Sequence, residues 1–210
     1  MQDTDDTVPH VIMAPRSIYF SFGVDVHERY PLEIPKERLD AMSPIKRKFY
    51  KGDPKRLTLT ADQREGRKWR PLPAFFMAGH LTVSKPLADL LLRFDIGPAR
   101  LRPVDLTAPK DADRGLDHVS LSFYPVTPTH PVLVDRCRSL APQQPGDRQH
   151  FIELTVEPGD IVLSATPQNT ADIWYDPVLY SVYFASGPLS RALIDAGMAK
   201  DLWLVPCALT

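Results

Sequence analysis

The sequence predicts an α+β protein in which a mixed, mainly antiparallel sheet carries a few short helices. Segments rich in β-branched and aromatic residues recur along the chain and indicate strands. Two segments repeat the pattern of strand, capped helix and strand, so we expect two similar strand-helix-strand units. The 22 prolines among 210 residues are about twice the average share of about 5%, which favours short elements.

Length and composition predict one globular domain. The chain has 210 residues, of which 43% are hydrophobic and 24% charged, enough apolar material for a sizeable core. We expect a flexible tail over residues 1–10 and a single α+β domain over 11–210. An alternative division places an N-terminal subregion at 11–73 and a C-terminal subregion at 74–210.

Charge and cysteine usage favour a cytoplasmic protein. A net charge of -1 argues against a surface built throughout for nucleic acid or an anionic membrane. Cys137 and Cys207 form neither a metal-binding spacing nor a disulfide framework, which fits a reducing compartment. The opening MQDTDDTVPH lacks the features of a secretory signal, and no apolar run reaches the length of a membrane span.

The first elements are predicted from local composition. Residues 18–26, IYFSFGVDV, are aromatic and β-branched and predict a strand. Residues 36–51 predict a short helix broken before Pro44, because a proline disfavours the helical conformation of its predecessor. Residues 75–83, FFMAGHLTV, predict a further strand.

A short helix follows that strand. Ser84 is a suitable N-cap, and Pro86 forfeits no intrahelical hydrogen bond in the first turn. Four residues recur at helical spacing and make one apolar face: Leu87, Leu90, Leu91 and Phe94. Gly97-Pro98 ends the helix, and residues 99–106 form an extended segment.

Residues 178–209 repeat this pattern. VLYSVYFA predicts a strand, Ser186 the cap, Pro188 the early proline and LWLVPCAL the closing strand. The inward face of the helix is predicted at Leu189, Ala192, Leu193 and Ala196. In the alignment of the two copies, one residue is gained before Leu101 matches Leu204 and Pro103 matches Pro206.

Two further segments complete the predicted sheet. LDHVSLSFYPV, residues 116–126, alternates as a half-buried strand does. FIELTVEPGDIVLSA, residues 151–165, predicts a hairpin of two alternating runs joined across Glu-Pro-Gly-Asp.

Residues 46–70 form a basic segment. It holds ten basic and three acidic residues, a formal charge of +7 in a chain of -1. Such clusters are most often solvated faces, and the alternative is a surface that binds a partner. The partner-binding residues predicted here are Lys46, Arg47, Lys48, Lys51, Arg67, Lys68, Trp69 and Arg70.

The aromatic run at residues 173–184 could fill the core of the protein or form an interface with a partner. Aromatic residues fill cores, and they are also enriched at protein interfaces. We expect most of the run to be core, with Trp174, Tyr175 and Asp176 as its most exposed members and as partner-binding candidates.

The sequence carries no motif of known catalytic chemistry. It contains no glycine-rich phosphate loop, G-x-S-x-G, H-E-x-x-H or C-x-x-C, and we predict no catalytic, cofactor-binding or metal-binding residues. His80 and His118 are expected to be ordinary hydrogen-bonded histidines beside strands. Cys137 lies between Arg136 and Arg138, which could depress the pKa of its thiol, but no sequence cue pairs it with a histidine and a reactive cysteine is the less favoured interpretation.

The repeated segments resemble a family of bacterial immunity proteins of polymorphic toxin systems. The segments are VSKPLADLLLRFDIGPARLRPV and LSRALIDAGMAKDLWLVPC, and the likeness covers about residues 75–209. The resemblance rests on three features: a Ser-capped helix after an apolar strand, an aspartate or glycine turn, and a Leu-x-Pro-Val ending. The resemblance implies a protein without catalytic residues that binds a cognate toxin effector, encoded by a neighbouring gene, and blocks its active site or substrate access.

Two other functions compete with this interpretation. One is an enzyme that reverses a toxin's modification, with a site in which His80, His118 or Cys137 meets carboxylates. The other is a module for single-stranded nucleic acid, in which Phe49, Tyr50 and Trp69 stack on bases between basic residues. The neutral total charge makes nucleic acid the less favoured partner.

Overall fold

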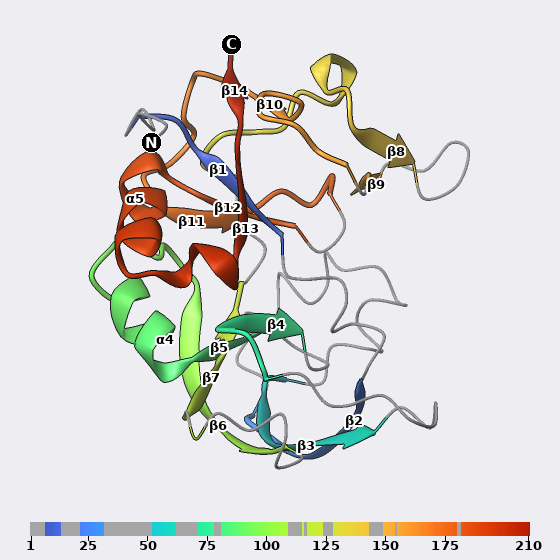
Figure 1. The fold of residues 1–210 in the computed structure, drawn as a ribbon, viewed down its shortest axis with the longest axis vertical. Coiled ribbons are helices and arrows are strands. Elements are labelled where there is room, and N and C mark those ends of the chain that lie inside the picture. Colours follow the sequence, from blue (N-terminus) through green and yellow to red (C-terminus); the bar gives the residue numbers. More distant parts are fainter. Residues whose placement is uncertain are drawn as a thin grey trace. The chain divides into compact units, whose positions relative to one another are not determined.

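In the residues that it describes, a computed structural model shows short strands and two short α-helices (Figure 1). The structure describes residues 7–13, 22–31, 52–61, 71–77, 81–108, 115, 117–123, 128–142, 149–153, 155–179 and 182–210. The sheets are mainly antiparallel, so the predicted α+β class is confirmed. No helix in these ranges is long and apolar enough to cross a membrane.

The chain divides into two compact units. Unit 1 comprises Met1–Pro15, Asp89–Pro98 and Pro125–Thr210, and unit 2 comprises Arg16–Ala88 and Ala99–Tyr124. The division falls within the first described helix, α4 (Lys85–Leu91). The prediction of a single domain over residues 11–210 stays a prediction.

Unit 2 is built on a six-stranded sheet. In the order β2-β3-β6-β7-β5-β4, its strands are β2 (Phe22–Arg29), β3 (Pro54–Ala61), β6 (Arg100–Thr107), β7 (His118–Ser122), β5 (Leu81–Ser84) and β4 (Phe75–Met77). The β3-β6 pair is parallel, and all other neighbours are antiparallel. Helix α4 connects β5 to β6, two strands that lie on either side of β7.

Unit 1 has a four-stranded antiparallel sheet in the order β11-β12-β1-β13. These strands are β11 (Ile173–Tyr175), β12 (Tyr183–Ala185), β1 (His10–Met13) and β13 (Trp203–Pro206), and helix α5 (Gly187–Asp195) connects β12 to β13. One residue after β13, β14 (Ala208–Leu209) pairs in parallel with β10 (Val162–Leu163). The remaining elements are a pair of antiparallel strands and two single 3-10 turns, namely β8 (Leu140–Pro142), β9 (His150–Ile152), η1 (Val134–Arg136) and η2 (Met198–Lys200).

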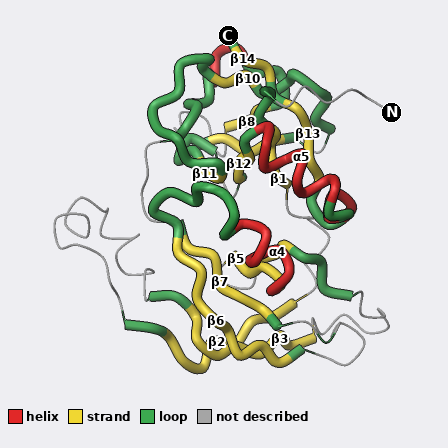
Figure 2. The backbone as a smooth tube through the Cα atoms, turned by 90° about the vertical axis from the view of Figure 1, so that its left-hand side faces the viewer, coloured by secondary structure: helices red, strands yellow, loops and turns green. Residues whose placement is uncertain are grey.

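The two units share one strand arrangement. The series β4-β5-β7-β6-β3 of unit 2 corresponds to β11-β12-β1-β13/β14-β10 of unit 1. Both series contain a helix between the second and fourth strands, shown in red in Figure 2. The match continues past β10 and β3, the last strands of the two series. Val132 forms an antiparallel bridge with Leu163 of β10, and Val26 of β2 pairs antiparallel with Leu57 of β3. The sequence repeat, which covers the helix and its adjoining strands, therefore marks only part of a larger structural repeat.

The residue registers of the two units also agree. Pro103 lies opposite Val119, and its sequence counterpart Pro206 lies opposite His10. The parallel pair Leu57 and Leu106 corresponds to Leu163 and Leu209. Further corresponding pairs are Phe76-Thr82 with Trp174-Phe184, and Thr82-Ser120 with Phe184-Val11. A shift of one residue would have turned every side chain to the opposite face, so this agreement is specific.

In each unit one strand lies between the two strands that the helix connects, but this middle strand comes from a different part of the chain in the two units. In unit 2 it is β7, which follows β6 along the chain. In unit 1 it is β1, which precedes all of unit 2 along the chain. Strand β1 fits closely, because Val11 and Ile12 are buried and Cys207 N donates to Pro9 O at 2.9 Å.

Helix α5 begins at a hydrogen-bonded cap. Ser186 Oγ accepts from Leu189 N at 3.2 Å and donates to Asp172 Oδ1 at 2.5 Å. Asp172 N in turn donates to Asp95 O at 2.6 Å, and Asp172 Oδ2 accepts from Asp95 N at 3.0 Å. The predicted cap is confirmed, and it also joins the start of the helix to the loop that contains Asp95 in unit 1.

The helices bury most of the predicted apolar faces. Leu87, Leu90, Leu91, Leu189 and Leu193 are buried. Two residues of the predicted face of α5 differ, because Ala196 is exposed and Ala192 is only partly buried. The buried polar residue Ser190 lies on α5 instead.

Two predicted elements are wrong in their pairing. Residues 151–165 turn as expected, with Asp160 N donating to Glu157 O at 3.0 Å and Gly159 at a φ of +82°. However, β9 pairs with β8 and β10 with β14, so the two arms do not form a hairpin. Residues 75–83 do not form one strand, because β4 and β5 pair antiparallel with each other.

Other predicted elements are confirmed in part. The first predicted strand is β2, which extends to Arg29, while residues 18–21 lie outside the described part of the chain. The closing strand of the second copy is divided into β13 and β14. The helix predicted over residues 36–51 also lies outside the described residues.

Candidate functional site

The candidate site is a row of polar residues on the sheet of unit 2. Ser120 on β7 lies directly opposite Thr82 on β5 and Arg102 on β6. Directly opposed residues of antiparallel strands share a face, with Cβ atoms about 4.5–5.5 Å apart. His118 and Ser122, two residues away on β7, share that face because side chains alternate along a strand. We call Thr82, Arg102, His118, Ser120 and Ser122 the polar face.

The polar face is buried. Thr82 and Ser120 have no exposed surface, and Ser122 and His118 are 3% and 7% exposed. The Arg102 side chain is 17% exposed. We expected residues 116–126 to be a half-buried strand, and this is wrong because β7 is buried on both faces. Buried polar groups destabilise a fold unless hydrogen bonds compensate them, so these residues need an explanation.

Asp53 holds two members of the face in place. The carboxylate is 2% exposed, accepts from Ser122 Oγ at 2.5 Å and lies 3.5 Å from Arg102 Nε. The Arg102 guanidinium also lies over the Tyr30 ring, 4.9 Å from its centroid, in a cation-π contact. Tyr30 is anchored by its hydroxyl, which donates to Pro103 O at 2.9 Å.

The local backbone places Asp53 beside the sheet. Gly52, which precedes it, has a φ of +87°, a conformation that favours glycine. Asp53 O accepts from Tyr30 N at 2.9 Å, which fixes the start of β3 against the end of β2. Unit 1 has a similar Gly-Asp turn, in which Gly159 and Asp160 precede β10 and Asp160 O accepts from Arg138 N at 3.0 Å.

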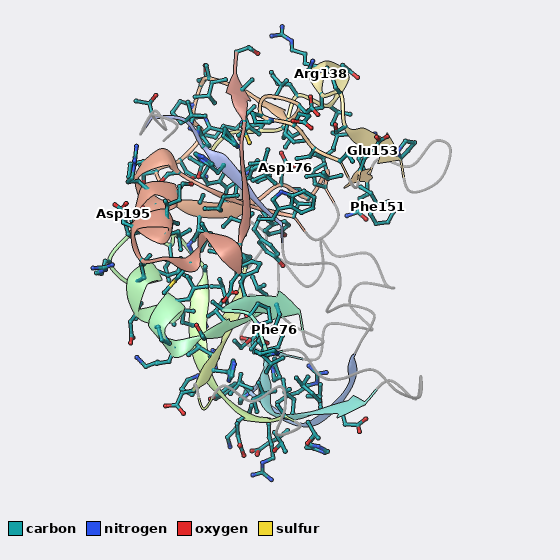
Figure 3. The ribbon with its side chains drawn as sticks, in the orientation of Figure 1. Phe76, Arg138, Phe151, Glu153, Asp176 and Asp195 are labelled. Atoms are coloured by element: carbon teal, nitrogen blue, oxygen red, sulfur yellow. The ribbon has the colours of Figure 1, made fainter. Side chains whose placement is uncertain are left out.

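One hydroxyl of the face has no partner. Ser120 Oγ is fully buried and makes no hydrogen bond in the structure as described. The neighbouring His118 ring packs edge-to-face against Phe76, with centroids 5.7 Å apart (Phe76 is labelled in Figure 3). Ser120 therefore presents an unused donor and acceptor between Thr82 and Arg102.

The same row is apolar in unit 1. Phe184, Val11 and Val205 occupy the positions that correspond to Thr82, Ser120 and Arg102. All three belong to the hydrophobic core of unit 1, together with Trp174, whose ring stacks on Phe184 at 5.7 Å. The strand arrangement does not itself require polar residues at this row, so their presence in unit 2 reflects another demand.

The predicted basic partner-binding residues are not placed. Lys46, Arg47, Lys48, Lys51, Arg67, Lys68, Trp69 and Arg70 all lie outside the described residues. Their role stays a prediction. Within the ranges that the structure describes, no group of three or more His, Cys, Asp or Glu residues is arranged to hold a metal ion.

Most of the aromatic run is buried as expected, but the expected exposure of Trp174 and Asp176 is wrong. Trp174 is 1% exposed because it fills the core of unit 1, and Asp176 is 6% exposed. Asp176, labelled in Figure 3, accepts from Val132 N at 2.8 Å and Val178 N at 2.9 Å, so it supports the backbone. Tyr175 is partly buried, and burial raises the pKa of its hydroxyl. Trp174 and Asp176 are therefore interior residues.

The alternative in which the neighbouring arginines depress the pKa of the Cys137 thiol is contradicted. Burial raises the pKa of its thiol, and the negative charge of Asp160 raises it further. The sulfur accepts from Val162 N at 3.2 Å and donates to Leu133 O at 3.4 Å. His80 lies outside the described residues, whereas His118 belongs to the polar face.

The sequence pattern did not point to three functional candidates, Trp203, Ser120 and Ser122. Trp203 is 43% exposed, and it aligns with Arg100 in the repeat, a position where an exposed residue could have been expected. The half-buried strand predicted over residues 116–126 would place Ser120 and Ser122 on its solvent side, whereas both are buried. A comparison of Ser120 with Val11, its counterpart in unit 1, shows that a polar residue replaces an apolar one. The sequence repeat does not reveal this pair, because β1 lies outside the repeated segments.

The comparisons with known proteins do not identify a family. No protein-family model matches the sequence, and no curated protein or solved structure matches it.

Proposed function

We propose that the protein is an immunity protein, which binds a cognate bacterial toxin effector in the cytoplasm and blocks its active site or its access to substrate. The proposal rests on the resemblance carried by residues 75–209 and on one exposed aromatic residue. Trp203 is 43% exposed at the start of β13. Tryptophan is among the residues most enriched at the energetic centres of protein interfaces.

A second exposed apolar residue supports a binding surface. Leu92, directly after α4, is 63% exposed, and it belongs to unit 1 as Trp203 does. These are the two large hydrophobic side chains exposed in the described residues. Covering exposed apolar side chains with a partner is favourable, because it removes apolar surface from water.

The test combines capture with survival. The tagged protein is used to pull down the product of the neighbouring gene, and cells that express this product are scored for growth with and without the protein. Trp203→Ala should weaken capture and rescue, while Asp135→Ala, an exposed change on η1, should leave both intact. Failure of the natural protein to capture or rescue would reject the proposal.

The basic segment gives an independent kinetic test. Reversing the charge of Lys46, Arg47 and Lys48 should weaken toxin binding mainly through a slower association rate, because electrostatic attraction steers the encounter. An unchanged association rate would exclude this segment from the interface.

An enzyme that reverses a toxin's modification is the second candidate. Its support is that His118 shares a face with Ser120 and Ser122, and that Ser122 is bonded to the Asp53 carboxylate. Purified protein incubated with modified toxin target would distinguish the candidates. Catalytic removal of the modification by substoichiometric protein supports the enzyme, whereas stoichiometric capture of the toxin supports the inhibitor.

A further inference from the structure

We propose that two copies of this chain exchange strand β1, so that residues 7–13 of one copy complete the sheet of unit 1 in the other. This self-association goes beyond toxin binding and stands or falls separately from it. The starting observation is that β1 lies between β12 and β13 and pairs antiparallel with both. We call the position that β1 occupies between these two strands the strand slot.

The strand slot is built from one part of the chain and filled by another. Strands β12 and β13 and the helix that connects them all lie within residues 183–206. Strand β1 belongs to Met1–Pro15, after which the chain continues into unit 2 from Arg16. Because the covalent connection from β1 to β12 and β13 runs through unit 2, packing and hydrogen bonds hold β1 in the slot.

The contacts of β1 can be reproduced by a second copy. Val11 has no exposed surface and lies opposite Phe184 and Val205 in the hydrophobic core of unit 1. Just before β1, Pro9 O accepts from Cys207 N at 2.9 Å. These contacts lie within unit 1, so the same residues of a second copy would form them equally well. Exchange of an identical element is a low-cost route to a dimer for this reason.

The two ends of the described segment lie at the surface of unit 1. Thr7, before the strand, is exposed. Met13, at its end, lies opposite Trp203, which is 43% exposed. The chain therefore enters and leaves the strand slot at the surface, and β1 can reach a second copy without a path through the core.

Unit 2 provides an internal comparison. Its middle strand β7 follows β6 after the ten residues 108–117, and these two strands pair with each other. A short connection gives a tethered segment a high effective concentration, which falls as the connection lengthens. Strand β1 is tethered to its slot through the whole of unit 2, so a second copy competes for the slot of unit 1 better than for that of unit 2.

The test follows the oligomeric state of the full chain after refolding. Protein unfolded in urea is refolded at about 1 mM and at about 1 µM, because effective concentrations of tethered segments reach the millimolar range. Size exclusion with light scattering measures the mass of the products. We expect a dimer fraction that rises with the refolding concentration. The dimer should persist after dilution, since its separation requires β1 to leave both slots.

The decisive variant supplies the strand within one chain, as unit 2 does. A second copy of residues 7–13 is added after Thr210 through a connection of ten residues, the length found between β6 and β7. This copy can fill the strand slot of its own chain, so the dimer fraction should fall about tenfold or more. The matched control is the same extension with Val11→Asp and Ile12→Asp, which the buried positions exclude. The control should dimerise as the natural chain does.

Three results would overturn the proposal. They are a monomer at both refolding concentrations, a dimer that separates at once on dilution, and a dimer fraction that the matching extension leaves unchanged. If the protein precipitates at about 1 mM, a biotinylated peptide of residues 7–13 at that concentration is refolded with the protein at about 1 µM. Retention of this peptide, but not of its Val11→Asp form, supports the exchange. Retention of both peptides or of neither rejects it.

Discussion

Val11 and Ser120 occupy the same position in two copies of one strand arrangement. Each lies in the strand between the two that a helix connects, and each is fully buried. Val11 is flanked by Phe184 and Val205, whereas Ser120 is flanked by Thr82 and Arg102. The chain thus contains an apolar and a polar form of the same sheet, and each unit serves as a control for the other.

Placing the polar residue in the apolar unit should destabilise the protein. Val11→Ser removes two buried methyl groups and adds a hydroxyl among Phe184 and Val205. We expect a loss of about 2–4 kcal/mol in the free energy of unfolding. Urea unfolding checks this value. A loss no larger than that caused by an exposed substitution would mean that Val11 is not tightly packed.

The two helices should depend on corresponding leucines. Leu91 and Leu193 are 1% and 0% exposed, and replacing either with Ala should cost about 2–5 kcal/mol of unfolding free energy. Leu92, the neighbour of Leu91, is 63% exposed and provides a matched control. Leu92→Ala should change stability by no more than about 0.5 kcal/mol. Equal effects of Leu91→Ala and Leu92→Ala in thermal unfolding would contradict the described helix face.

Acid should weaken unit 1 through Asp160. Hydrogen bonds from the Ser139 hydroxyl at 2.6 Å and the Glu157 amide at 2.9 Å, with the Arg138 guanidinium at 2.8 Å, lower the pKa of this carboxyl. Its stabilising contribution is present above the unfolded pKa of about 3.9 and is lost as the pH falls through the lower folded pKa.

The measurement compares variants across this acid range. Asp160→Asn should be less stable than the natural protein at neutral pH, and the difference should shrink as the pH falls below about 4. Asp135→Asn, an exposed change on η1, is the control. A difference between Asp160→Asn and the natural protein that is independent of pH would contradict the assigned role of the carboxylate.

Cys137 should react slowly in the folded protein. Burial raises the pKa of its thiol, so little of the reactive thiolate is present at neutral pH. Labelling with iodoacetamide should be slow in native Cys207→Ser protein, which leaves Cys137 as the single cysteine, and fast after unfolding in urea. Rapid labelling of the native variant would show that the thiol is activated.

Local rules made part of the fold predictable. The cap at Ser186, the early Pro188 and the apolar spacing of α5 all depend on residues close in sequence, and the structure confirms the helix. The hairpin predicted at residues 151–165 shows the limit. Its turn was predictable from Pro158 and Gly159, but β9 and β10 pair with strands that the local pattern does not name.

The candidate site was hidden for a related reason. Alternation of His118, Ser120 and Ser122 with Val119 and Leu121 predicts a strand with one solvated face. Burial of the polar side depends on what covers the sheet, which periodicity does not reveal. The exposed Trp203 was missed because aromatic residues in apolar runs usually lie in cores.

The position of β1 constrains the order in which the protein folds during synthesis. Strands β2 to β7 are made in succession and pair with one another, so unit 2 can complete its sheet early. Strand β1 emerges first but must wait for β12 and β13, which are made after all of unit 2. Until then Val11 and Ile12 are apolar residues on an unpaired strand, a state prone to aggregation. The nascent chain therefore carries its first strand exposed until its last strands leave the ribosome.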